Sequence, residues 1–116
     1  MAAIAHAVTE QGTRQTTTST TYVAVASLAS SNFVVGGVYL IRVTAITDGS
    51  NINTQYGARL THGSTEFSGT EAILEPMTAG PTASYTYTTH VIWTAVSGEA
   101  VNLELKSLSA GPTIGA

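Results

Sequence analysis

The sequence predicts an all-β domain, built either as a sandwich or as a barrel. Nearly every periodic segment alternates between apolar and polar residues with a period of two, which is typical of strands. These segments are short and are separated by Gly-rich turns, whereas no stretch keeps helical spacing over more than two turns. The chain has 116 residues, which fits one domain with a core of its own.

The first half of the chain supplies two strands and a hairpin. Residues Tyr22 to Leu28 predict the first of these strands. Residues Gly36 to Thr47 predict the strongest strand, and because both of its faces are partly apolar we expect it to be central in a sheet. Turn-forming residues from Asp48 to Asn53 end this strand. Residues 54–69 predict a hairpin that turns at His62-Gly63-Ser64, where glycine permits a positive φ.

The second half supplies two more long strands after an irregular connection. Pro76 and Pro81 would interrupt a ladder, so the connection is expected to be mostly loop, with one short strand at Ala72 to Leu74. The stretch from Ser84 to Gly98 predicts a long strand. One face of this strand holds Tyr85, Tyr87, Val91, Trp93 and Ala95, and Trp93 is expected to lie in the core. After a turn, the last strand alternates cleanly, with Val101, Leu103 and Leu105 inward.

The composition is poor in charge and rich in threonine. Charged residues make up 9% of the chain and the net charge is −3, against a usual charged fraction of about 25%. No basic run is present, which argues against nucleic acid as a partner. Threonine occurs twenty times, so the surface is expected to be neutral and hydrogen-bonding, although threonine is also simply a good strand residue. A surface with little charge favours packing against a neighbour.

The sequence predicts neither membrane insertion nor export. No apolar run approaches the roughly 18 residues that a membrane-spanning helix needs. The first twelve residues lack the charged and apolar regions of a secretory signal. We therefore expect a soluble protein that is made in the cytoplasm.

No motif of catalysis or metal binding emerges. The chain has no cysteine, which excludes disulfides and thiolate metal sites. There is no nucleophile elbow and no phosphate-binding loop. Three histidines share no metal-ligand spacing: His6, His62 and His90. Three glutamates are expected to be solvated rather than paired as acids: Glu66, Glu71 and Glu75. The sequence therefore predicts a protein that is not an enzyme and holds no cofactor.

The order of segments carries a resemblance to a known group of proteins. A lead-in strand is followed by "FVVGGVYLIRVTA", the hairpin "ARLTHGST", a Pro-bearing connection, and the strand pair "VIWTAVSGEAVNLELKSL". Over residues 20–110 this pattern resembles the jelly-roll sandwich of tailed-phage capsid decoration (cement) proteins and of fibre or tip domains. Sugar-binding modules and trimeric tumour-necrosis-factor-like sandwiches share the same pattern.

The resemblance implies an antiparallel jelly-roll-like β-sandwich with an extended N-terminal arm. The arm would comprise residues 1–19, the sandwich residues 20–110 and the C-terminal tail residues 111–116. Cement proteins decorate a capsid where its subunits meet, often as trimers, and perform no reaction. The resemblance thus implies a virion protein on the capsid surface, whose partners are the major capsid protein or another virion subunit and further copies of itself.

The arm contains little that a sandwich must bury, since Ile4 and Val8 are its only large aliphatic residues. Its extended backbone could pair with an exposed strand edge of a partner. Alternatively, the arm is the first strand of the sandwich itself. Tyr85 and Tyr87 lie near a strand end, where aromatic residues could join an interface. The candidate partner-binding residues are Ile4, Val8, Arg14, Gln15, Thr16, Thr17, Tyr85 and Tyr87.

A second hypothesis is a carbohydrate- or receptor-binding module at a phage fibre tip. Such a module needs exposed aromatic rings beside amide groups. The available residues are Tyr56, Tyr85 and Tyr87, together with Asn51 and Gln55.

Overall fold

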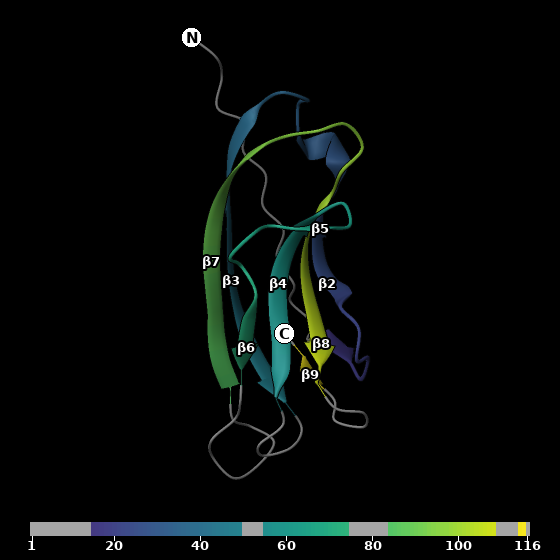
Figure 1. Cartoon of the computed structure of the whole chain (residues 1–116), viewed down its shortest axis with the longest axis vertical. Helices are drawn as coiled ribbons and strands as arrows, with labels where there is room; N and C mark the ends of the chain where they lie inside the picture. Colours follow the sequence, from purple (N-terminus) through teal and green to yellow (C-terminus); the bar gives the residue numbers. More distant parts are fainter. Residues whose placement is uncertain (1–14, 50–54, 75–83, 109–113, 116) are drawn as a thin grey trace.

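A computed structural model describes residues 15–49, 55–74, 84–108 and 114–115 (Figure 1). In this part of the chain the regular structure is β, apart from one 3-10 turn at Ser30–Asn32. The strands are β1 (Thr16–Thr17), β2 (Val23–Leu28), β3 (Val38–Gly49), β4 (Tyr56–His62), β5 (Thr65–Glu66), β6 (Ala72–Leu74), β7 (Ser84–Thr94), β8 (Val101–Ser107) and β9 (Ile114–Gly115).

The strands form two antiparallel sheets that pack face to face. One sheet, here called sheet A, has the strand order β1-β9-β3-β7. The other, sheet B, has the order β2-β8-β4-β5, and β6 also pairs with β4. Figure 1 shows β7 and β3 in one layer, with β4, β8 and β2 in the other. The predicted all-β sandwich is confirmed.

The strand pairs are nested, as they are in a jelly roll. β1 pairs with β9, β2 with β8, β3 with β7, and β4 with both β5 and β6. The chain can therefore be drawn as one long hairpin whose successive strand pairs alternate between the two sheets. The hairpin rolls up through the additional pairs β3–β9 and β4–β8. This is the double-sheet arrangement of a jelly roll.

The ends of the sandwich differ from the predicted boundaries. Thr16–Thr17 were expected in the arm and Ile114–Gly115 in the tail, but they form β1 and β9 of sheet A. For Thr16 and Thr17 the alternative interpretation holds, in which the arm leads into the first strand. Two-residue strands carry no alternation that a sequence pattern could reveal, so their pairing could not be predicted. Residues 1–14 lie outside the described part of the chain.

Most of the predicted strands occur where the pattern put them. β2, β6 and β8 are confirmed almost to the residue, and the hairpin of β4 and β5 turns at Gly63 with a φ of +57°. β3 extends two residues further than expected, because Asp48 and Gly49 pair with β9. The predicted turn residues 50–53 lie outside the described residues.

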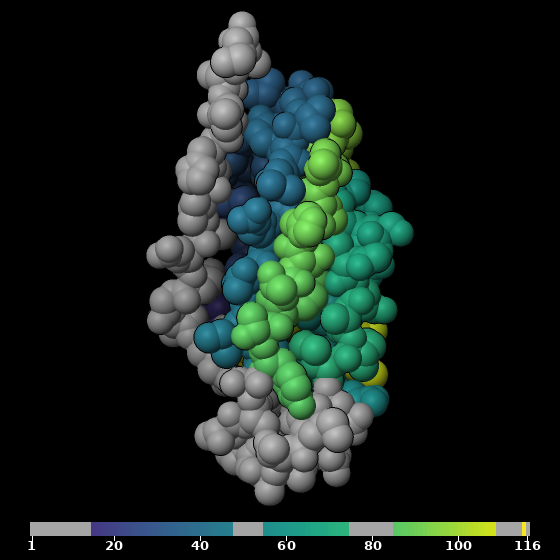
Figure 2. All heavy atoms as spheres, turned by 90° about the vertical axis from the view of Figure 1, so that its left-hand side faces the viewer, coloured from purple at the N-terminus to yellow at the C-terminus, as the bar shows by residue number. Residues whose placement is uncertain are grey.

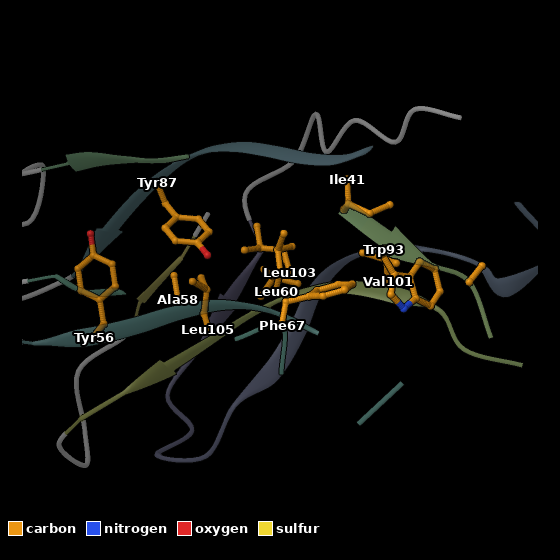
Figure 3. Packing of buried hydrophobic residues seen from close by; sticks show 12 residues of the cluster. Ile41, Tyr56, Ala58, Leu60, Phe67, Tyr87, Trp93, Val101, Leu103 and Leu105 are labelled. Carbon is orange, nitrogen blue, oxygen red and sulfur yellow. The ribbon is translucent and has the colours of Figure 1, made fainter. Parts of the chain in front are cut away.

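The core lies between the two sheets (Figure 3). Its buried apolar residues are Val25, Ile41, Tyr56, Ala58, Leu60, Phe67, Tyr87, Trp93, Ala95, Val101, Leu103 and Leu105. Trp93 is in the core as predicted, with edge-to-face contacts to Phe33 and Phe67 at ring-centroid distances of 5.2 and 5.9 Å. A polar link joins the sheets inside this core, because the hydroxyl groups of Thr47 and Tyr56 are hydrogen bonded at 2.8 Å.

The strand that runs beside β4 is broken into β5 and β6. Between them, Leu60 of β4 faces the turn at residues 67–70 instead of a strand. The Leu60 N–H donates to the hydroxyl of Thr70 at 3.1 Å, and the Leu60 carbonyl accepts from Phe67 N–H at 2.9 Å. The buried Thr70 side chain thus takes the place of a missing backbone partner, which the buried ladder requires.

Candidate interaction surface

On the outer face of β3 and β7, called the β3–β7 face below, every side chain that the structure describes is exposed. The two strands pair in continuous register over eleven residue pairs. Because side chains alternate across a strand, every second residue points away from the core. These residues are Val38, Leu40, Arg42, Thr44 and Ile46 of β3, and Thr86, Thr88, His90, Ile92 and Thr94 of β7. Figure 2 shows the β7 and β3 side of the molecule, with the two strands running along it together.

Large aliphatic side chains gather at one end of this face. Leu40 and Ile92 are cross-strand neighbours, with 57% and 76% of their surface exposed. Val38, next to them on the same face of β3, is 68% exposed. The turn that leads into β3 adds two further exposed residues, Val34 and Val35. Exposed aliphatic residues scattered singly are ordinary, but a contiguous group of them indicates a contact surface.

The rest of the face is neutral except for one cross-strand pair. Arg42 and His90 face each other in the ladder, and they are the ionisable residues among the outward-facing side chains that the structure describes. Beyond them the face consists mainly of threonines. The hydroxyl groups of Thr44 and Thr88 lie 3.4 Å apart, and Thr88 donates to the Val43 carbonyl at 3.1 Å.

Sheet B presents the opposite chemistry on its outer face. Arg59 of β4 forms an ion pair with Glu104 of β8 at 2.7 Å and a longer one with Glu66 at 3.7 Å. The Arg59 guanidinium also lies over the ring of Tyr22, 4.0 Å from its centroid, and the Lys106 ammonium lies 4.5 Å from the same centroid. These two cation–π contacts fix the Tyr22 ring between the side chains of β4 and β8.

Tyr22 completes this charged network. Its hydroxyl donates to a carboxylate oxygen of Glu71 at 2.7 Å. Partial burial, and then the Glu71 carboxylate, raise the pKa of Tyr22 well above its ordinary value. Gly57 lies against this ring, and a Cβ atom at position 57 would collide with the Tyr22 hydroxyl. Glycine at this position therefore permits the close approach of the ring.

A second polar group lies at the hairpin end of sheet B. His62 Nδ1 is 2.5 Å from a carboxylate oxygen of Glu99. The imidazole also contacts Phe67 and Trp93, at centroid distances of 4.7 and 5.5 Å. Within the described residues, no three His, Asp or Glu side chains lie close enough together to hold a metal ion.

The sandwich therefore has two chemically distinct outer faces. The face of sheet B carries Arg59, Lys106 and their carboxylate partners, and such groups are expensive to dehydrate. The β3–β7 face carries exposed aliphatic groups, whose burial is favourable, and threonine hydroxyls, which need hydrogen-bond partners when buried but cost less to dehydrate than charges. Of the two, the β3–β7 face is the one suited to contact with another macromolecule.

The structure places the predicted partner-binding residues in different environments. Tyr87 is 4% exposed and its hydroxyl donates to the Thr70 carbonyl at 2.5 Å, so it belongs to the core, and its expected place at an interface edge is corrected. Tyr85 is half-buried against the core. Thr16 is exposed, whereas Gln15 and Thr17 are half-buried at the edge of sheet A. Ile4, Val8 and Arg14 lie outside the described residues.

The aromatic platform of the carbohydrate hypothesis is not formed. Tyr56 is fully buried and bonded to Thr47, and Tyr87 is also in the core, so neither ring can stack on a sugar (Figure 3). Gln55 is exposed, and Asn51 lies outside the described residues. Tyr56 and Tyr87 are in phase with the core residues of their strands, and this alternation is the sequence feature that indicates burial.

Sequence reasoning missed the β3–β7 face. The apolar residues on both faces of β3 predicted a central strand. β3 does lie between β9 and β7, but its outer face is exposed. A sequence pattern cannot distinguish a face covered within the chain from a face covered by a partner, because both select the same residues.

Comparisons with known proteins add no assignment. No family model matches the chain, and neither curated proteins nor solved structures gave a match. The described residues contain no helix long and apolar enough to cross a membrane.

Proposed function

We propose that this protein is a structural subunit of a virion, which decorates or cements a viral capsid by binding across the seams between capsid subunits. The observation that carries the proposal is the exposed aliphatic group on the β3–β7 face, set against the charged outer face of sheet B. A decorating subunit needs this asymmetry, because one side must lie on the shell while the other faces water.

Burial of the aliphatic group would supply the binding free energy. Moving a Leu or Ile side chain from full exposure to full burial contributes roughly 1.5–3 kcal/mol. Leu40, Ile92 and Val38 together could therefore contribute several kcal/mol, part of which is offset by the entropy lost on association. Because the subunit would bind only the assembled shell, each bound copy would stabilise that shell by mass action.

The fold is compatible with this role but does not select it. Jelly rolls occur in viral capsid domains, lectins and cupins, so the architecture alone leaves several functions open. The resemblance of residues 20–110 to capsid decoration proteins favours the virion role. Residues 1–14 would add a second contact, by pairing with a strand edge of the shell.

Shell binding by matched variants of the two outer faces tests the proposal. Purified protein is mixed with empty shells of the major capsid protein encoded in the same genome, and occupancy is measured by sedimentation and cryo-electron microscopy. The double variant Leu40→Gln, Ile92→Gln is expected to bind at least about tenfold more weakly, because it removes two exposed aliphatic groups. The control Ile73→Gln makes the same kind of change on β6, where Ile73 is 48% exposed on sheet B.

The outcomes separate clearly. Loss of binding in the β3–β7 double variant, with normal binding by Ile73→Gln, supports the proposal. Full occupancy by the double variant, or a genome that encodes no capsid protein, contradicts it. Deletion of residues 1–14 is expected to leave a folded sandwich, because β1 begins at Thr16, and to weaken shell binding.

A further inference from the structure

The edge of β7 forms a second exposed surface, separate from the β3–β7 face. β7 is the last strand in the order of sheet A, so it pairs with β3 on one side only within the described residues. Its backbone groups alternate in direction, as in any antiparallel ladder. Ala95, which directly follows β7, bonds through both its N–H and its carbonyl to Gly36 and Gly37 on the β3 side.

This alternation identifies the backbone groups at the outer edge. The odd-numbered residues of β7 bond toward β3, like Ala95, so the even-numbered residues point their N–H and carbonyl groups away from it. These residues are Thr86, Thr88, His90, Ile92 and Thr94, and their side chains are also exposed. β7 is visible along its whole length in Figure 2.

The edge strands of sheet B carry features that discourage pairing between molecules, whereas β7 itself carries none of them. Natural sheets discourage pairing between molecules by keeping edge strands short, by bulges, and by placing Lys or Pro on them. In sheet B, β5 and β6 have two and three residues, and β2 has a shift of register between Ala24 and Ala26. β7 has eleven residues in unbroken register with β3. It contains no proline, no glycine, and no Lys, Arg, Asp or Glu.

We propose that two copies of this protein pair antiparallel through their β7 strands, about a two-fold axis, and so join their A sheets into one continuous sheet. The self-complementary composition of β7 favours a second copy over a foreign strand. An antiparallel pair of identical strands can satisfy the edge groups of both molecules in one isologous contact. Since β7 contains no Lys, Arg, Asp or Glu, no register places permanently like charges opposite each other.

Such a pair would place the two β3–β7 faces side by side on one surface. The proposal does not depend on capsid binding, because the contact uses backbone edges and would form in free solution. A two-fold contact joins two copies and does not by itself generate the three-fold assembly that the cement resemblance implies.

Analytical ultracentrifugation of matched proline variants tests the contact. The wild-type protein is expected to approach twice the chain mass of 11.9 kDa as its concentration rises. Thr88→Pro removes an edge N–H and is expected to weaken dimerisation about tenfold, since proline is tolerated on edge strands. Thr44→Pro is the control, because Thr44 lies opposite Thr88 on the far side of the same ladder and is expected to leave the dimer intact.

Amide exchange and cross-linking keep the test decisive if Thr88→Pro fails to fold. In the wild-type dimer, the even-numbered amides of β7 should exchange slowly, and dilution to the monomer should release them while the odd-numbered amides stay protected. Because the chain contains no cysteine, single variants Thr86→Cys, Thr88→Cys and His90→Cys can locate the two-fold axis by disulfide formation.

The proposal is overturned if the wild-type protein keeps the mass of one chain at all concentrations. It is also overturned if only Thr44→Pro changes the mass, or if the even-numbered amides exchange fast in a dimer. Failure of shell binding would not affect these measurements, so the two proposals stand or fall separately.

Discussion

Single side chains repair the places where the backbone of the sandwich is incomplete. Thr70 is the main example, because its hydroxyl accepts from Leu60 N–H and donates to the Phe67 carbonyl at 2.8 Å. The side chain is only 4% exposed, so water cannot easily replace either bond. The sequence predicts neither the break between β5 and β6 nor the role of Thr70 as a hydrogen-bond partner of the backbone. In the sequence, Thr70 is simply one polar residue in a turn.

Replacing Thr70 by valine should therefore lower the free energy of unfolding, although the two side chains have nearly the same shape. The variant keeps the volume but leaves the Leu60 N–H without its partner, which costs about 1–3 kcal/mol for a buried donor. Thr70→Ser, the control, keeps the hydroxyl and should retain most of the stability. Urea unfolding followed by circular dichroism measures the difference, and equal stability of the two variants would contradict the assignment.

Tyr87 should make the protein sensitive to alkaline pH. Burial raises the pKa of Tyr87 from its ordinary value of 10 to about 12. Between these values the unfolded chain releases this proton and the folded chain retains it, so the free energy of unfolding falls as pH rises. The Tyr87 contribution is fully present below pH 10. It should decrease by about 1 kcal/mol between pH 9 and pH 11.

Denaturant unfolding at several pH values measures this effect. Tyr87→Phe should be less stable at pH 8, because it loses the bond to the Thr70 carbonyl, but its stability should depend less on alkaline pH. Tyr22, whose pKa is also raised, should supply a remaining dependence in that variant. An unchanged pH profile in Tyr87→Phe would exclude Tyr87 as a source.

At the scale of strands, sheet B is held together on its outer face by the packing of Tyr22 over Gly57. A methyl group at position 57 would collide with the Tyr22 hydroxyl, so Gly57→Ala should displace the ring from Arg59 and Glu71. We expect a loss of about 1–2 kcal/mol, because one cation–π contact contributes about 0.5–1 kcal/mol and solvent exposure reduces the contribution of the hydrogen bond to Glu71.

A double-mutant cycle identifies the cause of that loss. If the collision with the hydroxyl is responsible, Gly57→Ala should cost less in a Tyr22→Phe background, where the hydroxyl is absent. Thermal unfolding of the four proteins gives the coupling energy. Additive effects would show that Gly57 matters for its backbone rather than for the space above it.

The strands were predictable to the extent that their residues alternate. β3, β7 and β8 are long and in phase with the core, so Ile41, Trp93 and Leu103 were placed correctly from the pattern alone. β1 and β9 have two residues each and depend on partners about a hundred positions away in the sequence. The Tyr22 network is equally long-range, because Tyr22 meets Glu71 and Lys106 only after the sheet has formed.

The candidate site was less predictable than the fold. Exposure of the β3–β7 face follows from the absence of a third layer over sheet A in the described residues, which no local pattern encodes. For Tyr56 and Tyr87, by contrast, the hydroxyl groups find partners in Thr47 and Thr70, so both aromatic residues can be buried. The sequence alone does not show whether a tyrosine is exposed or is buried with a hydrogen-bond partner for its hydroxyl group.

At the scale of the whole molecule, the segregation of charge predicts how binding responds to salt. Because Arg42 and His90 are the only ionisable residues among the described side chains of the β3–β7 face, attachment through it should change little when ionic strength is raised from about 0.05 to 0.5 M. Attachment through sheet B would weaken over this range, because Arg59 and Lys106 would be screened. Co-sedimentation of protein and shells at several salt concentrations distinguishes the two faces.

The nested pairing also brings the first and last strands of the sandwich together. Because Thr16 pairs with Gly115 and Thr17 with Ile114, the start of β1 lies beside the end of β9. A short linker between these strands, together with new ends at the Gly63-Ser64 tip, would give a circular permutant that keeps every strand pair except the β4–β5 connection. Such a permutant should reach the same sandwich by a different order of assembly, with β1 and β9 forming the first hairpin instead of the last pair to close.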